Sequence, residues 1–267
     1  MQASGLAQAD LERRFGGLRR LYGDAAYARL RALRVAVIGL GGVGSWAAEA
    51  LARSGVAELS LVDLDHVAES NINRQVQAVG ATIGAAKVQA LRERIADIHP
   101  GCTIHGIEEF VNEHNWPALL PQPVDAVIDA CDQVRAKLAM AAWSLACGVP
   151  LVSVGAAGGK HRAQAVEVDD LAAVTHDPLL AALRQRLRKH HGATRAGRIG
   201  LRCVFSRETV QPPAGLDACD LDGNLNCHGY GSSVAVTATF GMVAAGAVIE
   251  ALIAKVQPEP AASKTTL

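Results

Sequence analysis

A glycine-rich turn, followed by amides and cations, could bind a phosphate anion. The stretch "GLGGVGS" follows the apolar run "RVAVI" and contains Gly39, Gly41, Gly42 and Gly44. Such glycines let the chain turn tightly, admit a phosphate close to the backbone and allow a helix to pack closely. The N–H groups and the dipole of the following helix then favour an anion. The spacing fits the dinucleotide-binding fingerprint, which by itself suggests a dehydrogenase.

The residues after the turn do not suit a nicotinamide site. Asp63 ends the next apolar run, where an acid commonly accepts hydrogen bonds from ribose hydroxyls, whereas Asp65 fits a turn acid better. The stretch "SNINRQ" and the helix that follows it supply amides and cations: Asn71, Arg74, Gln75 and Lys87. Two cations that converge on a phosphate-binding turn suit three phosphates better than two.

One further carboxylate completes the set. Asp132, in "DACDQ", follows a later apolar run and is expected at the same edge of the sheet. A single carboxylate beside two cations suggests Mg²⁺ on a nucleoside triphosphate, because magnesium takes one or two carboxylates together with phosphate oxygens. The residues therefore predict a site for a nucleoside triphosphate and Mg²⁺, with Arg74, Lys87 and Asp132 as the catalytic candidates and Asp132 as the metal ligand.

An α/β fold with a doubly wound, mostly parallel sheet would bring these residues together. After a helical, arginine-rich segment over residues 10–34, apolar strands alternate with helices of ten to fifteen residues. We expect strands at 34–38, 58–65, 102–110 and 124–131, and helices at 43–54, 85–99 and 134–147. Such alternation is typical of a Rossmann-like sheet, which binds ligands beyond the carboxyl ends of its strands.

The sequence predicts one ATP-binding domain over residues 10–255. Residues 30–160 form its nucleotide-binding half, and residues 161–255 add a basic helix, a long crossover loop and a C-terminal helix. Residues 256–267 are expected to be a disordered tail. The apolar run 232–254 is nearly long enough to span a membrane. Its many Ala, Gly and Thr residues and Glu250 favour a buried core or dimer-interface helix, with membrane association as the other interpretation.

Composition narrows the class of protein. The 267 residues are 50% hydrophobic and carry a formal net charge of +0, so any nucleic-acid contact must come from a local patch. Six cysteines form no C-x-x-C pair, which argues against structural zinc. The polar N-terminal stretch has no apolar secretory segment, and we expect a cytoplasmic protein with reduced thiols. Cys203, Cys219 and Cys227 are interpreted as buried or loop thiols rather than nucleophiles.

The ordered motifs "GLGGVGS…LVDLD…SNINRQ…GAAK…DACD" resemble the adenylating domain of ubiquitin-activating enzymes and of the thiamine and molybdopterin-synthase adenylyltransferases. The resemblance covers about residues 14 to 160. It implies that a substrate carboxylate attacks the α-phosphate of ATP and forms an acyl-adenylate and pyrophosphate. By position, the glycine turn would hold phosphate, Asp63 the ribose, Asn71, Arg74 and Lys87 the phosphates, and Asp132 the metal.

A narrower resemblance covers about residues 12 to 255. The stretches "RFGGLRRLYG", "VSVGAAGGKHRAQ", "DLAAVTHDPLLAALRQRLR" and "VTATFGMVAAGAVI" resemble the bacterial tRNA threonylcarbamoyladenosine dehydratases. The resemblance implies adenylation of the threonine carboxylate next to the anticodon, ring closure with release of AMP, and net loss of water. It also implies a homodimer in which an arginine near the N-terminus reaches the partner's ATP; Arg14 and Arg20 are the candidates.

The basic stretch after residue 183 would suit a tRNA backbone. Its candidate contacts are Arg184, Arg186, Arg188, Lys189 and Arg195, joined further on by Arg198 and Arg202. No stacking aromatics accompany them, so the stretch indicates affinity rather than specificity.

Three other functions stay open from the sequence. The domain could adenylate the C-terminus of a ubiquitin-like sulfur-carrier protein, could be a nucleotide-binding dehydrogenase, or could only dock a cysteine desulfurase or sulfur-acceptor partner.

Overall fold

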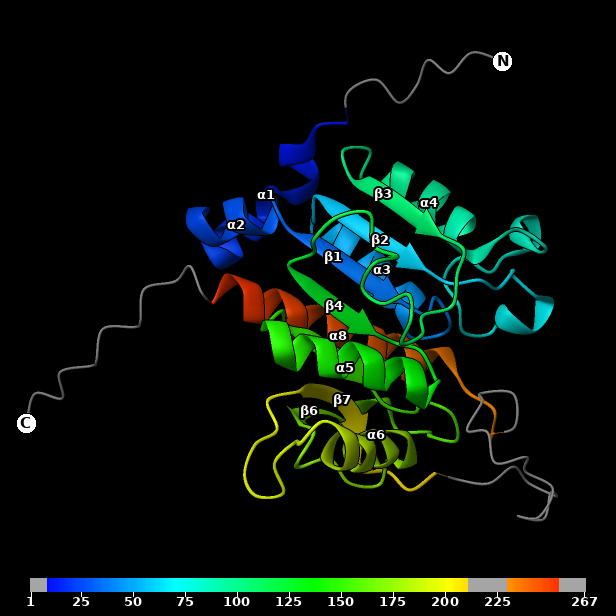
Figure 1. Ribbon diagram of the computed structural model, residues 1–267. Helices are drawn as coiled ribbons and strands as arrows, with labels where there is room; N and C mark the ends of the chain where they lie inside the picture. Colours follow the sequence, from blue (N-terminus) through cyan, green and yellow to red (C-terminus); the bar gives the residue numbers. More distant parts are fainter. Residues whose placement is uncertain (1–8, 211–229, 255–267) are drawn as a thin grey trace, which may run out of the picture.

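A seven-stranded sheet runs through the centre of the computed structural model, which describes residues 9–210 and 230–254 (Figure 1). The strand order is β3-β2-β1-β4-β5-β7-β6. All neighbouring strands are parallel except β6 and β7. The strands are β1 Arg34–Ile38, β2 Glu58–Val62, β3 Thr103–Ile107, β4 Ala126–Asp129, β5 Leu151–Val154, β6 Val166–Asp170 and β7 Arg202–Ser206. The prediction of a mostly parallel, doubly wound sheet is confirmed.

Helices cover both faces of this sheet. The cluster of buried residues on one face includes residues of α3, α4 and α8, and the cluster on the other includes residues of α5 and α6 (Figure 1). The helices are α1 Leu11–Tyr22, α2 Asp24–Leu30, α3 Gly44–Arg53, α4 Lys87–Ile98, α5 Val134–Cys147, α6 Pro178–His190 and α8 Val234–Ile253. The predicted helical segment 10–34 is divided at Gly23, whose φ of 82° ends α1.

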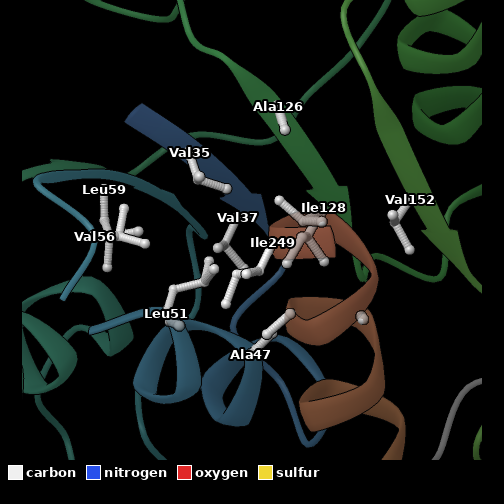
Figure 2. Packing of buried hydrophobic residues seen from close by; sticks show 14 of the residues in the cluster. Val35, Val37, Ala47, Leu51, Val56, Leu59, Ala126, Ile128, Val152 and Ile249 are labelled. Atoms are coloured by element: carbon white, nitrogen blue, oxygen red, sulfur yellow. The ribbon is translucent and has the colours of Figure 1, made fainter. Parts of the chain in front are cut away.

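The central strands are buried on both faces, as their continuous apolar runs predict. Val35 and Val37 of β1 belong to the cluster shared with α3 and α8, whereas Ala36 and Ile38 belong to the opposite cluster. Figure 2 shows the first of these clusters, with Ile249 of α8 among its labelled members. Side chains alternate between the faces of a strand, so one five-residue strand contributes to two hydrophobic layers.

Helix α8 is a core helix of this fold. By length and composition it could cross a membrane, but 61% of its most apolar window is buried inside the protein. It packs closely on α3: a Cβ added to Gly241 would lie 2.4 Å from the carbonyl oxygen of Val43. The interpretation of residues 232–254 as a buried helix therefore describes the structure.

The N-terminal helix is attached to the far end of α4. Arg14 donates hydrogen bonds of 2.6 and 2.7 Å to two carbonyls at the C-terminal end of α4. The ring of Phe15 packs on His99, with centroids 4.7 Å apart. Burial, together with the neighbouring Arg31 guanidinium, lowers the pKa of His99 to about 4, so this histidine is neutral at pH 7. Arg14 thus lies at the amino ends of the strands, opposite to the nucleotide-binding turn.

The second part of the chain adds strands that the sequence pattern did not indicate. β6 and β7 pair antiparallel at one edge of the sheet, and β7 also pairs with β5. Most of the crossover loop, residues 211–229, lies outside the described residues, as do Cys219, Cys227 and the tail from residue 255. Cys203, in β7, is a buried thiol, and burial raises its pKa.

Two glycines of α8 provide a matched test of this packing. Gly241→Ala should lower the free energy of unfolding by about 1–3 kcal/mol, because the added methyl group overpacks the contact with α3. Gly246 is exposed and a Cβ there would meet nothing within 4 Å, so Gly246→Ala should raise stability by up to about 1 kcal/mol through helix propensity. Urea unfolding of both variants checks this, and equal effects would contradict the close approach.

Candidate nucleotide-binding site

A cleft of about 1150 Å³, solvent at its mouth included, opens beyond the carboxyl ends of β1, β2, β4 and β5. The strand order reverses between β1 and β4, which is where ligands bind in open α/β sheets. The cleft brings together most of the residues predicted from the sequence: Gly39, Gly41, Gly42, Asp63, Arg74, Gln75, Lys87 and Asp132. Asp132 is exposed in the cleft, on the turn between β4 and α5.

The glycine turn has two different steric requirements. Gly39 has a φ of 84°, which favours glycine. A Cβ on Gly44 would lie 1.7 Å from the carbonyl oxygen of Gly39, so α3 can start only with glycine at this position. Gly44 does not line the cleft; it sets how closely α3 approaches β1. At Gly41 a Cβ would meet nothing within 4 Å, so the backbone there faces open space.

Asp63 joins the glycine turn to the end of β2. One carboxylate oxygen accepts a 2.6 Å hydrogen bond from the Leu40 N–H, and the other accepts one of 2.8 Å from the Asp65 N–H. Burial raises the pKa of Asp63, and the Lys87 charge and these N–H donors oppose the rise. Asp63 is only 9% exposed, yet it lines the cleft, and its carboxylate could accept hydrogen bonds from the hydroxyl groups of a ribose.

Lys87 is held in an ion pair that the sequence analysis did not foresee. Its ammonium lies 2.8 Å from Asp65 and 3.8 Å from Asp63. Asp65, interpreted above as a turn acid, therefore both lines the cleft and neutralises the predicted phosphate ligand. The Asp65 side chain is 58% exposed while that of Lys87 is 7% exposed. A phosphate could replace the exposed carboxylate as the partner of the lysine.

Arg74 is positioned through its own backbone and side chain. Its guanidinium donates to the Ser70 carbonyl at 2.7 Å and to Asn73 Oδ1 at 2.9 Å, through one of its nitrogens. The indole N–H of Trp46, on α3, donates to the Arg74 carbonyl at 2.9 Å. The arginine is thus connected to the helix that follows the glycine turn, and its other N–H donors are free of hydrogen bonds within the described residues.

Asn71, predicted to contact the phosphates, uses its amide oxygen within the protein. Its Oδ1 accepts a hydrogen bond of 3.0 Å from the Ala68 N–H, within the short helical turn that contains it. It is buried and does not line the cleft. A short amide is equally suited to a ligand contact and to capping a turn, and the sequence does not separate the two.

Part of the cleft wall carries little sequence signal. Glu109, Phe110 and Val111 follow β3, Gly155–Gly158 follow β5, and Leu179 and Thr237 come from α6 and α8. The "GAAGG" run after β5 could have marked a close backbone approach, since glycines in loops often do. The N-terminal end of α6 is fixed at this wall: Asp177 caps the helix at the Leu180 N–H and also accepts from the Ala156 N–H at 2.8 Å.

The basic stretch forms an open groove along α6, and not all of its arginines are available to a ligand. Arg184 donates to the carbonyls of Leu171 and Val174 at 2.9 and 2.7 Å, so it holds the preceding segment in place. Arg202 pairs with Glu250 on α8 at 3.0 Å. The groove is lined by Ala181, Arg184, Gln185, Arg188, Lys189 and Arg195, without an acidic side chain. Arg186 is half-buried and outside this lining.

The doubly wound sheet, the glycine turn and the cation-lined cleft are those of a Rossmann-like adenylating domain. The chain belongs to the ThiF family, whose model matches residues 14–267.

Individual relatives extend this similarity over nearly the whole chain. The tRNA threonylcarbamoyladenosine dehydratase of Haemophilus influenzae is 39% identical over 247 residues, which cover 91% of this chain and 95% of that protein. The crystal structure of the Escherichia coli tRNA N6-threonylcarbamoyladenosine dehydratase in complex with ATP is 38% identical, with a TM-score of 0.84, over 92% of this chain and 97% of that one. The molybdopterin-synthase adenylyltransferase of E. coli is 38% identical over 124 residues, covering 46% of this chain and 49% of that protein.

Substitutions of Gly41 and Gly44 are expected to have opposite effects. Gly41→Ala should fold with an unchanged melting temperature but bind ATP at least about tenfold more weakly, a loss of about 1.4 kcal/mol, because its methyl group enters the open cleft. Gly44→Ala should fail to form the turn and lose much of the folded state, because its methyl group collides with the Gly39 carbonyl. Calorimetric titration with ATP and thermal melting check both; unchanged ATP affinity of Gly41→Ala would contradict this placement of the phosphates.

Proposed function

We propose that the chain catalyses the ATP-dependent dehydration, with cyclisation, of threonylcarbamoyladenosine at the anticodon-adjacent position of tRNA. The observation that carries this proposal is the extent of similarity. The dehydratases of Haemophilus influenzae and Escherichia coli match over 91–92% of this chain, whereas the E. coli molybdopterin-synthase adenylyltransferase matches over 46%. The part beyond the nucleotide-binding half therefore favours the dehydratase.

ATP would lie along the glycine turn, with its phosphates toward Arg74 and Lys87. Within residues 9–210 and 230–254, no three His, Cys, Asp or Glu side chains gather as a metal site. A Mg²⁺ ion would therefore take most of its ligands from the phosphates, with Asp132 as the exposed carboxylate in reach of them. When bound, the metal would neutralise charge on the phosphates.

The chemistry explains why the described lining of the cleft has cations and neither a serine nor a histidine. The threonine carboxylate is already a nucleophile; its oxygen attacks the α-phosphorus and the bond to pyrophosphate breaks. A nucleophile on the carbamoyl group then attacks the activated carbonyl carbon, and AMP leaves. The barrier lies in bringing two anions together, which Arg74, Lys87 and the N–H groups of the turn lower by position and charge.

Modified tRNA provides the direct test of this reaction. Incubation of the chain with ATP, Mg²⁺ and tRNA that carries threonylcarbamoyladenosine should give one AMP and one pyrophosphate per nucleoside converted. Mass analysis of the nucleoside should show the loss of one water. Arg74→Ala and Lys87→Ala should each lower the rate about 10²–10³-fold.

Two alternatives are tested in the same assay. tRNA without the modification should give no stimulation, and NAD should not protect the protein as ATP does. If a carrier protein ending in Gly-Gly stimulated pyrophosphate release and modified tRNA did not, the chain would be a carrier adenylyltransferase instead. Sulfur-transfer partners, a cysteine desulfurase among them, would then become relevant.

The groove along α6 is the surface that we propose for the tRNA backbone. Helix α6 starts at the cleft wall, since Asp177 joins its first turn to Ala156. The groove starts further along α6, at Ala181, and its lining carries no acidic side chain. Phosphate contacts of this kind position a nucleic acid without reading its sequence. Arg184 donates to two backbone carbonyls, and Nε of Arg188 donates to the Thr194 carbonyl at 3.1 Å. The proposed phosphate contacts therefore come mainly from Lys189 and Arg195, with the terminal nitrogens of Arg188 beside them.

Charge reversal separates tRNA binding from ATP binding. Lys189 and Arg195 are both exposed. Lys189→Glu and Arg195→Glu should each weaken tRNA binding several-fold and leave ATP affinity unchanged. The slope of log affinity against log salt concentration should decrease by about the value of one phosphate contact. Filter binding at several salt concentrations and calorimetry with ATP check this. Asp24→Lys, an exposed change at the start of α2, serves as a control. Equal tRNA affinity in all three variants would remove α6 from the proposed surface.

A homodimer in a cytoplasmic setting completes the proposal. Of the two candidate arginines, Arg14 and Arg20, we propose that Arg20 contacts the ATP of the partner subunit. It is exposed on α1 and forms no hydrogen bond within the described residues, whereas Arg14 is engaged at the end of α4.

A further inference from the structure

A buried ion pair lies beneath the floor of the cleft. Lys137 of α5 and Asp129, the last residue of β4, are both fully inaccessible to solvent, and their charged groups are 3.0 Å apart. Burial by itself lowers the pKa of Lys137, but the Asp129 carboxylate more than offsets this and raises it, so the lysine is a cation. Because desolvation of both charges is costly, such a pair is weak evidence for stability, and another role is expected of it.

The ammonium of Lys137 joins the ends of two neighbouring strands. It donates to the Val154 carbonyl, at the end of β5, at 2.7 Å, and lies 3.3 Å from the Asp129 carbonyl, at the end of β4. The hydroxyl of Ser153 donates to Asp129 Oδ2 at 2.7 Å. Both strand ends lead directly into segments that line the cleft, residues 130–133 and 155–158.

The other oxygen of Asp129 holds the turn that carries Asp132. Asp129 Oδ1 accepts from the backbone N–H of Cys131 at 3.3 Å and from its thiol at 3.0 Å. Burial raises the pKa of Cys131, so the thiol keeps the proton that it donates. Since α5 begins at Val134, the ion pair fixes the turn from both sides: through Asp129 before it and through Lys137 after it.

We propose that Asp129 and Lys137 are positioning residues that hold Asp132 and the facing loop 155–158 in the geometry needed for adenylation, without touching the nucleotide. The inference rests on the proposed function. In this proposal the hydrogen bonds of the pair maintain the shape of the cleft rather than the stability of the fold. Removing the pair should therefore lower the catalytic rate and leave the melting temperature nearly unchanged.

The test replaces the pair with apolar side chains of similar volume, in the full chain. Asp129→Leu with Lys137→Met should melt within a few degrees of the parent and bind AMP, without Mg²⁺, within about threefold. Its kcat for tRNA-dependent pyrophosphate release should fall about 10²-fold, as expected for a reacting group displaced by about 1 Å, and its KM for ATP with Mg²⁺ should rise no further than that of Asp132→Asn. Glu49→Gln, which disturbs the buried carboxylate bound by Arg94 on the far side of α3, should leave kcat unchanged.

Asp132 separates a positioning role from a structural one. In parent protein, Mg²⁺ should tighten ATP binding, and Asp132→Asn and the double variant should each lose this effect. A variant that carries all three substitutions should lose no more activity and no more Mg²⁺ dependence than Asp132→Asn alone, because the effects of coupled residues do not add. Additive losses, or a double variant with parental kcat and parental Mg²⁺ dependence, would overturn the proposal.

A milder variant covers the case in which the double variant does not fold. Ser153→Ala removes one hydrogen bond to Asp129 at little change in volume, and should lower kcat about 5–10-fold, again without effect in the Asp132→Asn background. If the parent shows no tRNA-dependent turnover, the proposed function fails, while the Mg²⁺ dependence of ATP binding still decides the positioning role.

Discussion

The bend from β1 into α3 leaves no room for a side chain at Gly44, and the site depends on this contact. The hypothetical Cβ would lie 1.7 Å from the Gly39 carbonyl oxygen, so α3 begins in direct contact with the end of β1. Helix α8 constrains the same bend from its other side, because a Cβ on Gly241 would lie 2.4 Å from the Val43 carbonyl oxygen. Other backbone therefore packs against the glycine turn on two sides. Helix α8, which is apolar and long enough to span a membrane, helps in this way to shape the site.

Three cations at the carboxyl edge of the sheet have partners within the protein. Lys87 is paired with Asp65, Lys137 with Asp129, and Arg74 with a backbone carbonyl and an amide. Pairs open to solvent can exchange a partner for an incoming phosphate at modest cost, whereas the fully buried pair cannot. The pair of Lys87 and Asp65, open to the cleft, is thus suited to ligand exchange, whereas the buried pair of Lys137 and Asp129 keeps its geometry.

Much of this arrangement is predictable from the sequence, for physical reasons. Continuous apolar runs reveal the central parallel strands, and the order of glycines, amides and cations indicates which residues meet at their ends. β6 is missed because an edge strand is half exposed and its acids, in "VEVDD", break the apolar run. Lys137 is missed because a lysine inside a helix is usually a solvated charge. The role of Asn71 stays a prediction, because a short amide serves a turn as well as a ligand and its oxygen caps a turn here.

The hydrogen bond from the Trp46 indole to the Arg74 carbonyl gives the protein an intrinsic optical reporter. The chain has three tryptophans, and the other two, Trp116 and Trp143, stack edge to face at 5.3 Å among the residues buried on the α5 side of the sheet. In the part of the chain that the structure describes, Trp46 is the tryptophan whose indole donates a hydrogen bond to the backbone of a residue that lines the cleft. Its emission should follow any displacement of Arg74, so occupancy of the cleft can be monitored by fluorescence without a label.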